Sequence, residues 1–287
     1  MSTAPNAPAT PSCYKHPNRE YGAICRRCDR PICADCMVEA PVGWQCRECV
    51  HDWNKKAPAT KWQPKAAGVR GFGLGNSRMT PVTGTLIAVN VVVFLVSGFG
   101  SGSLVGRFEM VPALVHQEPY RLLTAAFLHA NWLHIAFNMY ALAIFGPAVE
   151  SIVGRVRFGL LYLTAGLGGG VASYLLSPEL WGGVGASGAI FGLMGAYFVL
   201  ARHHRLDTSA VIMVVVMNVI IGFVDTQIDW RTHLGGLVVG AVVAFGYTRA
   251  EAFRGRSAIL VQAGVLLVTL AALGGLLLVP AGQVNWT

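Results

Sequence analysis

The chain has 287 residues, of which 54% are hydrophobic and only 13% are charged, and its formal net charge is +8. Soluble domains carry about 25% charged residues, so this composition excludes an ordinary soluble protein and indicates an all-α membrane protein with several spans. A nucleic-acid-binding role for the basic residues is an alternative that we do not expect. The polar N-terminus shows no short apolar core before a cleavage site, so we expect no secretory signal peptide.

The first predicted element is a metal-binding module at residues 13–51, preceded by a leader at residues 1–12 that we expect to be disordered. All seven cysteines lie in this module and, with one histidine, form four pairs that each have a two-residue gap. The eight ligands are Cys13, His16, Cys25, Cys28, Cys33, Cys36, Cys46 and Cys49. Zinc takes four tetrahedral sulfur or nitrogen ligands, so the module is predicted to hold two structural zinc ions, with His51 as a substitute ligand.

An odd number of cysteines argues against a set of disulfides, which also requires an oxidising compartment. Reduced thiolates therefore place this end of the chain in the cytoplasm. The module is too small for a substantial hydrophobic core, so metal binding is expected to supply its folding free energy.

A linker at residues 52–79, rich in Lys, Arg, Pro and Gly, is predicted to lie near anionic lipid headgroups. Seven apolar segments follow, which we interpret as membrane spans. They cover residues 81–98, 131–151, 156–176, 187–201, 208–224, 232–249 and 258–279. The first six form a predicted core at residues 80–250, and the seventh belongs to a C-terminal part at residues 257–287. The fourth is short, which requires that protein shield its end.

Loop charges predict the orientation, because cytoplasmic loops carry an excess of Lys and Arg. The basic loops are those after the second, fourth and sixth segments, whereas the loop at 177–183 and the C-terminal tail have no basic residue. The N-terminus is therefore expected inside and the C-terminus outside. Arg107 and Arg121, in the long first loop (99–130), are an exception to this pattern.

Four polar side chains lie at the starts of three apolar segments, where ionisable or reactive groups are usually functional. His134 and Asn138 are four residues apart and share one helical face, and both can donate hydrogen bonds to a developing oxyanion. Ser187 lies in the sequence Gly-Ala-Ser-Gly at a predicted helix N-terminus, and His233 begins the sixth segment. Glycines repeat every four residues after both and allow close helix packing, which would bring Ser187 to His233 as a nucleophile and its base.

Together these motifs resemble the rhomboid family of intramembrane serine proteases over about residues 81–250. The resemblance implies a six-helix bundle, here followed by a seventh helix. It implies that Ser187 is the nucleophile, that His233 is its base, and that His134, Asn138 and the Ser187 backbone N–H hold the oxyanion. Phe191 is then expected to stack on His233. Further implied structural positions are His129, Glu150 and the pair Tyr120-Arg121, where the family usually has Trp-Arg.

The cysteine spacing resembles a B-box-type zinc finger, which implies a cross-brace: the first and third pairs share one zinc, and the second and fourth share the other. The combined resemblance implies a multi-pass protein of a bacterial plasma membrane whose substrate is a transmembrane protein. We further expect the zinc module to bind a cytoplasmic protein partner or to regulate access to the site, and we expect no nucleic acid and no catalytic cofactor.

Three alternatives remain open. A proteolytically inactive relative could act as a binder, although the intact Ser187 and His233 argue against it. A transporter or channel would be expected to carry buried charges in its spans, which are scarce here. A membrane-anchored adaptor would use the zinc module alone and would not need the Ser, His and Asn residues.

Overall fold

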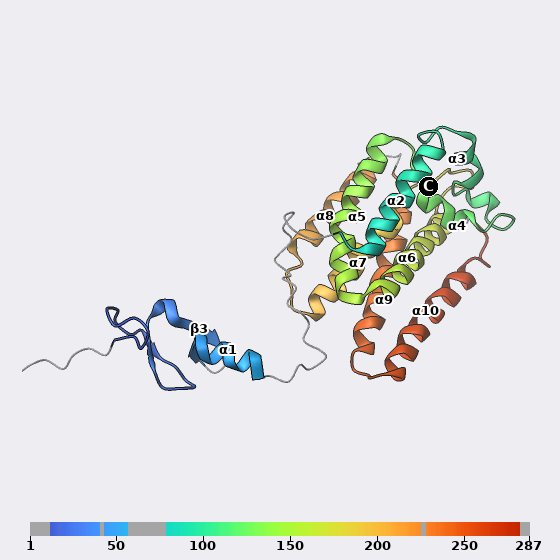
Figure 1. Ribbon diagram of the computed structural model, residues 1–287. Coiled ribbons are helices and arrows are strands. Elements are labelled where there is room, and N and C mark those ends of the chain that lie inside the picture. Colours follow the sequence, from blue (N-terminus) through green and yellow to red (C-terminus); the bar gives the residue numbers. More distant parts are fainter. Residues whose placement is uncertain (1–11, 41–42, 57–78, 225–227, 282–287) are drawn as a thin grey trace, which may run out of the picture. The chain divides into compact units, whose positions relative to one another are not determined.

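The computed structural model describes residues 12–40, 43–56, 79–224 and 228–281 (Figure 1). The chain divides into two compact units, Met1–Val69 and Arg70–Thr287. The predicted leader, apart from Ser12, and most of the predicted basic linker lie outside the described residues. The helix α1 (Arg47–Lys56) extends past residue 51, where that linker was expected to begin.

The first unit is built from two small hairpins and one helix. Strands β1 (Ala23–Ile24) and β2 (Pro31–Ile32) pair antiparallel, as do β3 (Met37–Ala40) and β4 (Gly43–Cys46). A short 3-10 turn (Ala34–Cys36) lies between the hairpins. The buried cluster of this unit consists of five cysteines and one isoleucine: Cys13, Cys25, Ile32, Cys33, Cys36 and Cys46. Such a core contains little apolar surface, so cysteine chemistry must hold the unit together.

Among its described residues, the second unit contains seven helices of 16 residues or more, one at each predicted apolar segment. They are α2 (Pro81–Val96), α5 (Trp132–Val153), α6 (Arg155–Leu176), α7 (Ser187–His203), α8 (Ser209–Val224), α9 (Trp230–Ala250) and α10 (Arg256–Leu276). The prediction of an all-α bundle is confirmed. The first loop adds the short helices α3 (Ser103–Phe108) and α4 (Arg121–Thr124) and the 3-10 turns Pro112–Leu114 and Ala125–Phe127.

Helix α7 is the centre of this bundle and packs against α5, α6 and α9 (Figure 1). Twelve of its 17 residues are buried, so protein shields the segment that the sequence showed to be short for a span. Helix α2 packs on α5, and α8 contacts α7 and α9. Helix α10 packs on α9 and α6 at the periphery, where it buries only Thr269 and Leu273.

The outer surface of the bundle is apolar, as contact with lipid requires. Large exposed hydrophobic residues occur on several helices, including Val96, Phe137, Met213, Leu260 and Val268. Within the described residues, α5, α6 and α10 are long and apolar enough to cross a membrane, and α2 and α8 are shorter apolar helices. The protein is therefore a multi-pass membrane protein with its polar site residues on internal helices.

Candidate active site

Ser187 is the first residue of α7, and it is half-buried. The first intrahelical hydrogen bond runs from the Ile190 N–H to the Ala186 carbonyl, at 3.0 Å. The N–H groups of Ser187, Gly188 and Ala189 precede that bond and so have no partner within the helix. A helix N-terminus of this kind attracts negative charge, so the serine stands where a developing oxyanion would be stabilised.

His233 lies in the first turn of α9 and stacks on Phe191 of α7. The two ring centroids are 4.1 Å apart and the ring planes differ by 6°. Phe191 follows Ser187 by four residues and therefore shares its helical face. The imidazole is thus held flat against the face of α7 that carries the serine, and the predicted stacking is confirmed. Among the hydrogen bonds of the described residues, none joins Ser187 to His233.

Backbone contact between α7 and α9 brings together the two helices whose first turns carry these residues. A methyl group on Gly236 would collide with the carbonyl of Gly188, and one on Gly240 would collide with the carbonyl of Gly192. The constant offset between the paired glycines shows that the two helices run parallel. Since helices approach this closely only through small residues, the glycine repeat confirms the packing that the sequence predicted.

Asp229 fixes the start of α9 and was not among the predicted site residues. Its carboxylate accepts hydrogen bonds from the Arg231 N–H (3.2 Å), the Thr232 hydroxyl (2.7 Å) and the Ser173 hydroxyl of α6 (2.6 Å). It is therefore a helix N-cap that also ties α9 to α6. An Asp before an apolar helix is the usual cap signal, but the bond to Ser173 could not be inferred from spacing.

His134 and Asn138 lie on α5, and Asn131 caps that helix by accepting from the His134 N–H at 2.9 Å. The Asn138 side chain is buried and its amide nitrogen donates to the His134 carbonyl at 2.9 Å. One amide hydrogen is engaged in this bond, and an amide has two. Asn138 therefore keeps a donor for a ligand while its rotamer is fixed by the helix.

Gly185 explains how His134 and Ser187 come to face the same space. It has a φ of +133°, and its N–H donates to the Ala125 carbonyl at 2.9 Å. A Cβ on Gly185 would lie 2.8 Å from the His134 Nε2 atom and 3.6 Å from the Ser187 Oγ atom. The absence of a side chain thus leaves a small space bordered by both groups, which suits a reacting carbonyl.

The remaining positions implied by the resemblance have structural contacts. His129 is fully buried and its ring packs edge-to-face on that of His134, with centroids 5.2 Å apart. Arg121 is buried and donates to the carbonyls of Gly106 (3.0 Å) and Glu109 (2.7 Å), which fastens the first loop. Tyr120 packs edge-to-face on Phe108. The loop is therefore anchored by the arginine although the aromatic partner is Tyr.

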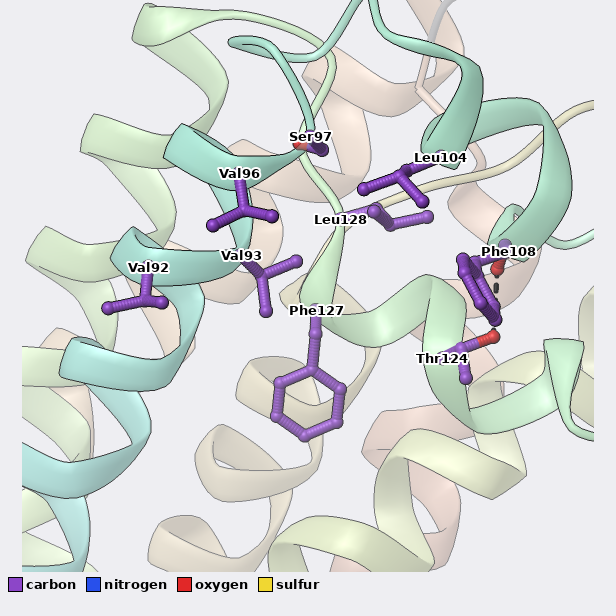
Figure 2. A pocket seen from close by; sticks show the side chains of 9 residues that line it. All are labelled: Val92, Val93, Val96, Ser97, Leu104, Phe108, Thr124, Phe127 and Leu128. Carbon is purple, nitrogen blue, oxygen red and sulfur yellow. Dashed lines mark hydrogen bonds between the residues drawn. The ribbon is translucent and has the colours of Figure 1, made fainter.

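An apolar cavity of about 410 Å³ lies elsewhere, between α2 and the first loop (Figure 2). Val93 of α2 and Phe127 of the first loop are among its walls, and the Thr124 hydroxyl donates to the Phe108 carbonyl at its edge (2.8 Å). Its lining contains none of the predicted catalytic side chains.

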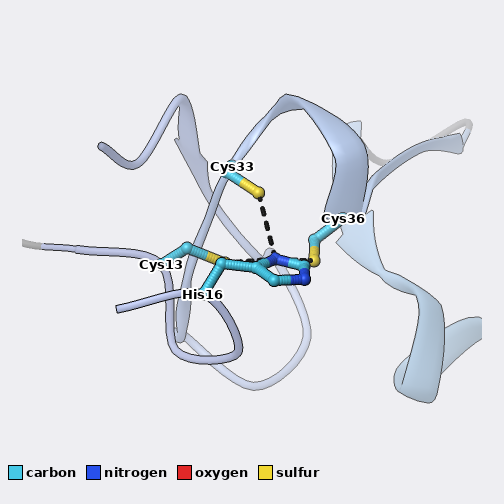
Figure 3. A group of neighbouring side chains, drawn as sticks. All are labelled: Cys13, His16, Cys33 and Cys36. Atoms are coloured by element: carbon cyan, nitrogen blue, oxygen red, sulfur yellow. Dashed lines mark hydrogen bonds between the residues drawn. The ribbon is translucent and has the colours of Figure 1, made fainter. Parts of the chain in front are cut away.

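The cysteine module brings the predicted ligands together in two groups of four. Cys13, His16, Cys33 and Cys36 form one (Figure 3), and Cys25, Cys28, Cys46 and Cys49 form the other. This grouping is the cross-brace implied by the resemblance, and His51 belongs to neither. The His16 Nδ1 atom lies 3.8, 3.5 and 3.4 Å from the sulfurs of Cys13, Cys33 and Cys36. A tetrahedral zinc would place such nitrogen and sulfur ligands about 3.5 Å apart.

The acidity of the thiols also fits a bound cation. Burial acts to raise the pKa of Cys13 and of Cys25, but neighbouring backbone N–H groups outweigh it and lower each pKa to about 6. The pKa of Cys36 is raised to about 11, mainly by burial and to a smaller extent by the nearby thiols of Cys13 and Cys33. Several thiolates packed this closely repel one another, and a divalent metal would supply the compensating positive charge.

Fold and site together define a polytopic helical membrane protein with serine and histidine on two glycine-packed helices. The family model described as Rhomboid domain matches residues 116–250, which include α5 to α9. The rhomboid protease GluP of Bacillus subtilis is 38% identical over 198 residues, which cover 64% of this chain and 38% of GluP. The putative rhomboid protease YdcA of the same organism is 32% identical over 177 residues, covering 58% of this chain and 89% of YdcA. The chain belongs to the rhomboid family.

A plant relative shows how far this similarity extends. RHOMBOID-like protein 6, mitochondrial, of Arabidopsis thaliana is 33% identical over 147 residues, which cover 49% of this chain and 47% of that protein. The chain spans less than half the length of this relative and of GluP. Similarity is therefore established for the helical bundle.

Proposed function

We propose that the protein is an intramembrane serine endopeptidase that cleaves transmembrane segments of other membrane proteins. The observation that carries the proposal is the position of Ser187 at an open helix N-terminus, one turn from the residue on which His233 stacks. The names of GluP and YdcA as rhomboid proteases support the same activity.

The chemistry follows from these positions as acyl transfer. His233 accepts the proton of the Ser187 hydroxyl while the Ser187 Oγ attacks the scissile carbonyl carbon. The carbonyl oxygen becomes an oxyanion that accepts from His134, Asn138 and the Ser187 N–H. His233 then donates its proton to the leaving amine, and a water molecule releases the acyl group by the same route. A regular helix hides its carbonyls, so the substrate helix must unwind locally.

The loop charges support the orientation in which this site opens on the outer side of the membrane. Arg155 and Arg157 lie in the first turn of α6. Arg202 lies in the last turn of α7 and Arg205 follows that helix, at the end remote from Ser187. Basic loops favour the cytoplasm, and we infer the same side for the N-terminal module. That compartment keeps thiols reduced, as two structural zinc ions require. The module then presents its surface to a cytoplasmic protein partner.

The test is cleavage of a model single-pass substrate by purified protein in liposomes, with Ser187→Ala beside it and Ser101→Ala as a control on an exposed loop serine. We expect the parent and the control to form product and to react with a fluorophosphonate probe, whereas Ser187→Ala does neither. Equal product from all three would identify another nucleophile or a contaminant. Absence of product and labelling from all three would favour an inactive relative or an adaptor.

A further inference from the structure

His203, His204 and Glu251 form a cluster at the ends of α7 and α9 that lie opposite Ser187 and His233. His203 is the last residue of α7, His204 is its C-cap, and Glu251 is the C-cap of α9. The His203 Nε2 atom lies 3.0 Å from Oε2 of Glu251, and the His204 Nε2 atom lies 3.8 Å from Oε1. One ligand atom from each residue falls within 4.8 Å of the others.

These distances suit a shared metal ion. Bonds of about 2.0–2.2 Å from zinc to imidazole nitrogen and carboxylate oxygen set neighbouring ligand atoms roughly 3–4 Å apart. The two imidazole planes are inclined by 79°, so adjacent residues reach one carboxylate from different directions. All three residues are exposed, which leaves further coordination positions to water.

The position of the two histidines at the C-terminal end of α7 also favours a bound cation. The carbonyl end of a helix such as α7 carries partial negative charge, which stabilises a cation near its last turn.

We propose that His203, His204 and Glu251 bind a divalent transition-metal ion of the zinc class, for which imidazole is a good ligand. The ion joins the last turn of the helix that begins with Ser187 to the end of the helix that carries His233. It therefore clamps the two parallel helices at the ends remote from those residues. Because the three ligands are exposed, the site exchanges metal with its surroundings, in contrast to the closed cysteine groups.

The test is calorimetric titration of the full-length protein in detergent with Zn²⁺, after dialysis and determination of the metal retained. We expect one further equivalent of Zn²⁺ to bind. His204→Ala and Glu251→Gln should each weaken its binding at least tenfold, whereas Glu179→Gln, which alters an exposed acid in another loop, leaves it unchanged. Cu²⁺ bound at the same site should show nitrogen hyperfine coupling in electron paramagnetic resonance, reduced in His204→Ala.

No further equivalent, or binding that the two ligand variants leave unaltered, would overturn the proposal. So would a loss of binding in Glu179→Gln equal to that in Glu251→Gln. Circular dichroism of each variant checks that the helices are intact. None of these readouts depends on proteolysis, so failure of this inference is separate from failure of the proposed function.

Discussion

In the proposed mechanism, Asn138 combines a structural and a chemical role within one side chain. Its amide nitrogen donates to the His134 carbonyl one turn earlier, which fixes the amide on the face of α5 that also bears the imidazole of His134. The bond holds the side chain before any substrate binds. A donor that is already oriented stabilises a developing charge without the cost of ordering it.

We predict that Asn138→Ala lowers kcat by about 10²–10³-fold, the usual effect of removing one oxyanion donor, with little change in KM. Asn218→Ala is the matched control, because Asn218 makes the same type of bond to the Val214 carbonyl one turn earlier on α8. Cleavage kinetics of the model substrate measure both. If the two variants lose activity equally, Asn138 acts through helix stability alone.

The sequence could identify the residues whose roles depend on spacing within one helix. The relation of His134 to Asn138, and of Phe191 to Ser187, follows from the helical repeat. It could not identify contacts that arise only when separate helices meet. Examples are the bond from Ser173 to Asp229 and the space over Gly185 that His134 borders.

At the scale of elements, the contact between α7 and α9 sets the position of the site. Carbonyl groups of α7 occupy the positions that a Cβ atom on Gly236 or Gly240 would need. A helix pair in backbone contact has no side-chain layer that could adjust to a larger residue. Gly169, in the C-terminal half of α6, also packs against Thr232 and Gly188, so α6 meets the starts of α7 and α9 at one tight junction.

We predict that Gly240→Ala destabilises the bundle by about 1–3 kcal/mol, the usual cost of inserting atoms into a packed interior, and reduces proteolysis by separating Ser187 from His233. Gly264→Ala is the control, because nothing lies near a Cβ at that position of α10. There alanine should be neutral or stabilising, since it favours helix over glycine by about 1 kcal/mol. Thermal unfolding in detergent measures both. Equal midpoints for the two variants would refute the tight contact.

The seven long helices could be predicted because each has a continuous apolar sequence, and their observed ends differ from the predicted ends by only a few residues. The short helices of the first loop could not. Their stability comes from contacts such as those of Arg121 with the carbonyls of Gly106 and Glu109. Segments as short as α3 and α4 have too few internal hydrogen bonds to form alone.

At the scale of the whole molecule, the two units bury different kinds of core. The bundle buries a large apolar core formed by α5, α6, α7 and α9. The module buries mainly cysteines. Metal binding to a module of this size supplies about 10–16 kcal/mol at neutral pH, more than so small an apolar core contributes.

We predict that a strong chelator unfolds the module and leaves the bundle folded. Limited proteolysis should then cut within residues 13–51, while the bundle, whose apolar core contains none of the cysteine ligands, should keep its helical circular dichroism. Chelator saturated with Zn²⁺ is the control and should protect the module. Protection that persists after measured metal loss would show that the module folds without metal.

The hydrogen bonds of Glu150 make the capping of α2 depend on a residue that is synthesised later in the chain. This buried carboxylate of α5 accepts from the backbone N–H groups of Val82 and Thr83 and from the Thr80 hydroxyl, all at the start of α2. Glu150 is synthesised 67 residues after Thr83. At ordinary rates of translation this separation corresponds to a delay of about 3 to 13 seconds. During that interval the first helix of the bundle has no carboxylate at its N-terminus. Completion of α2 is therefore a late event that depends on the arrival of α5, so a ribosome paused between the two would leave an incompletely capped helix in the membrane.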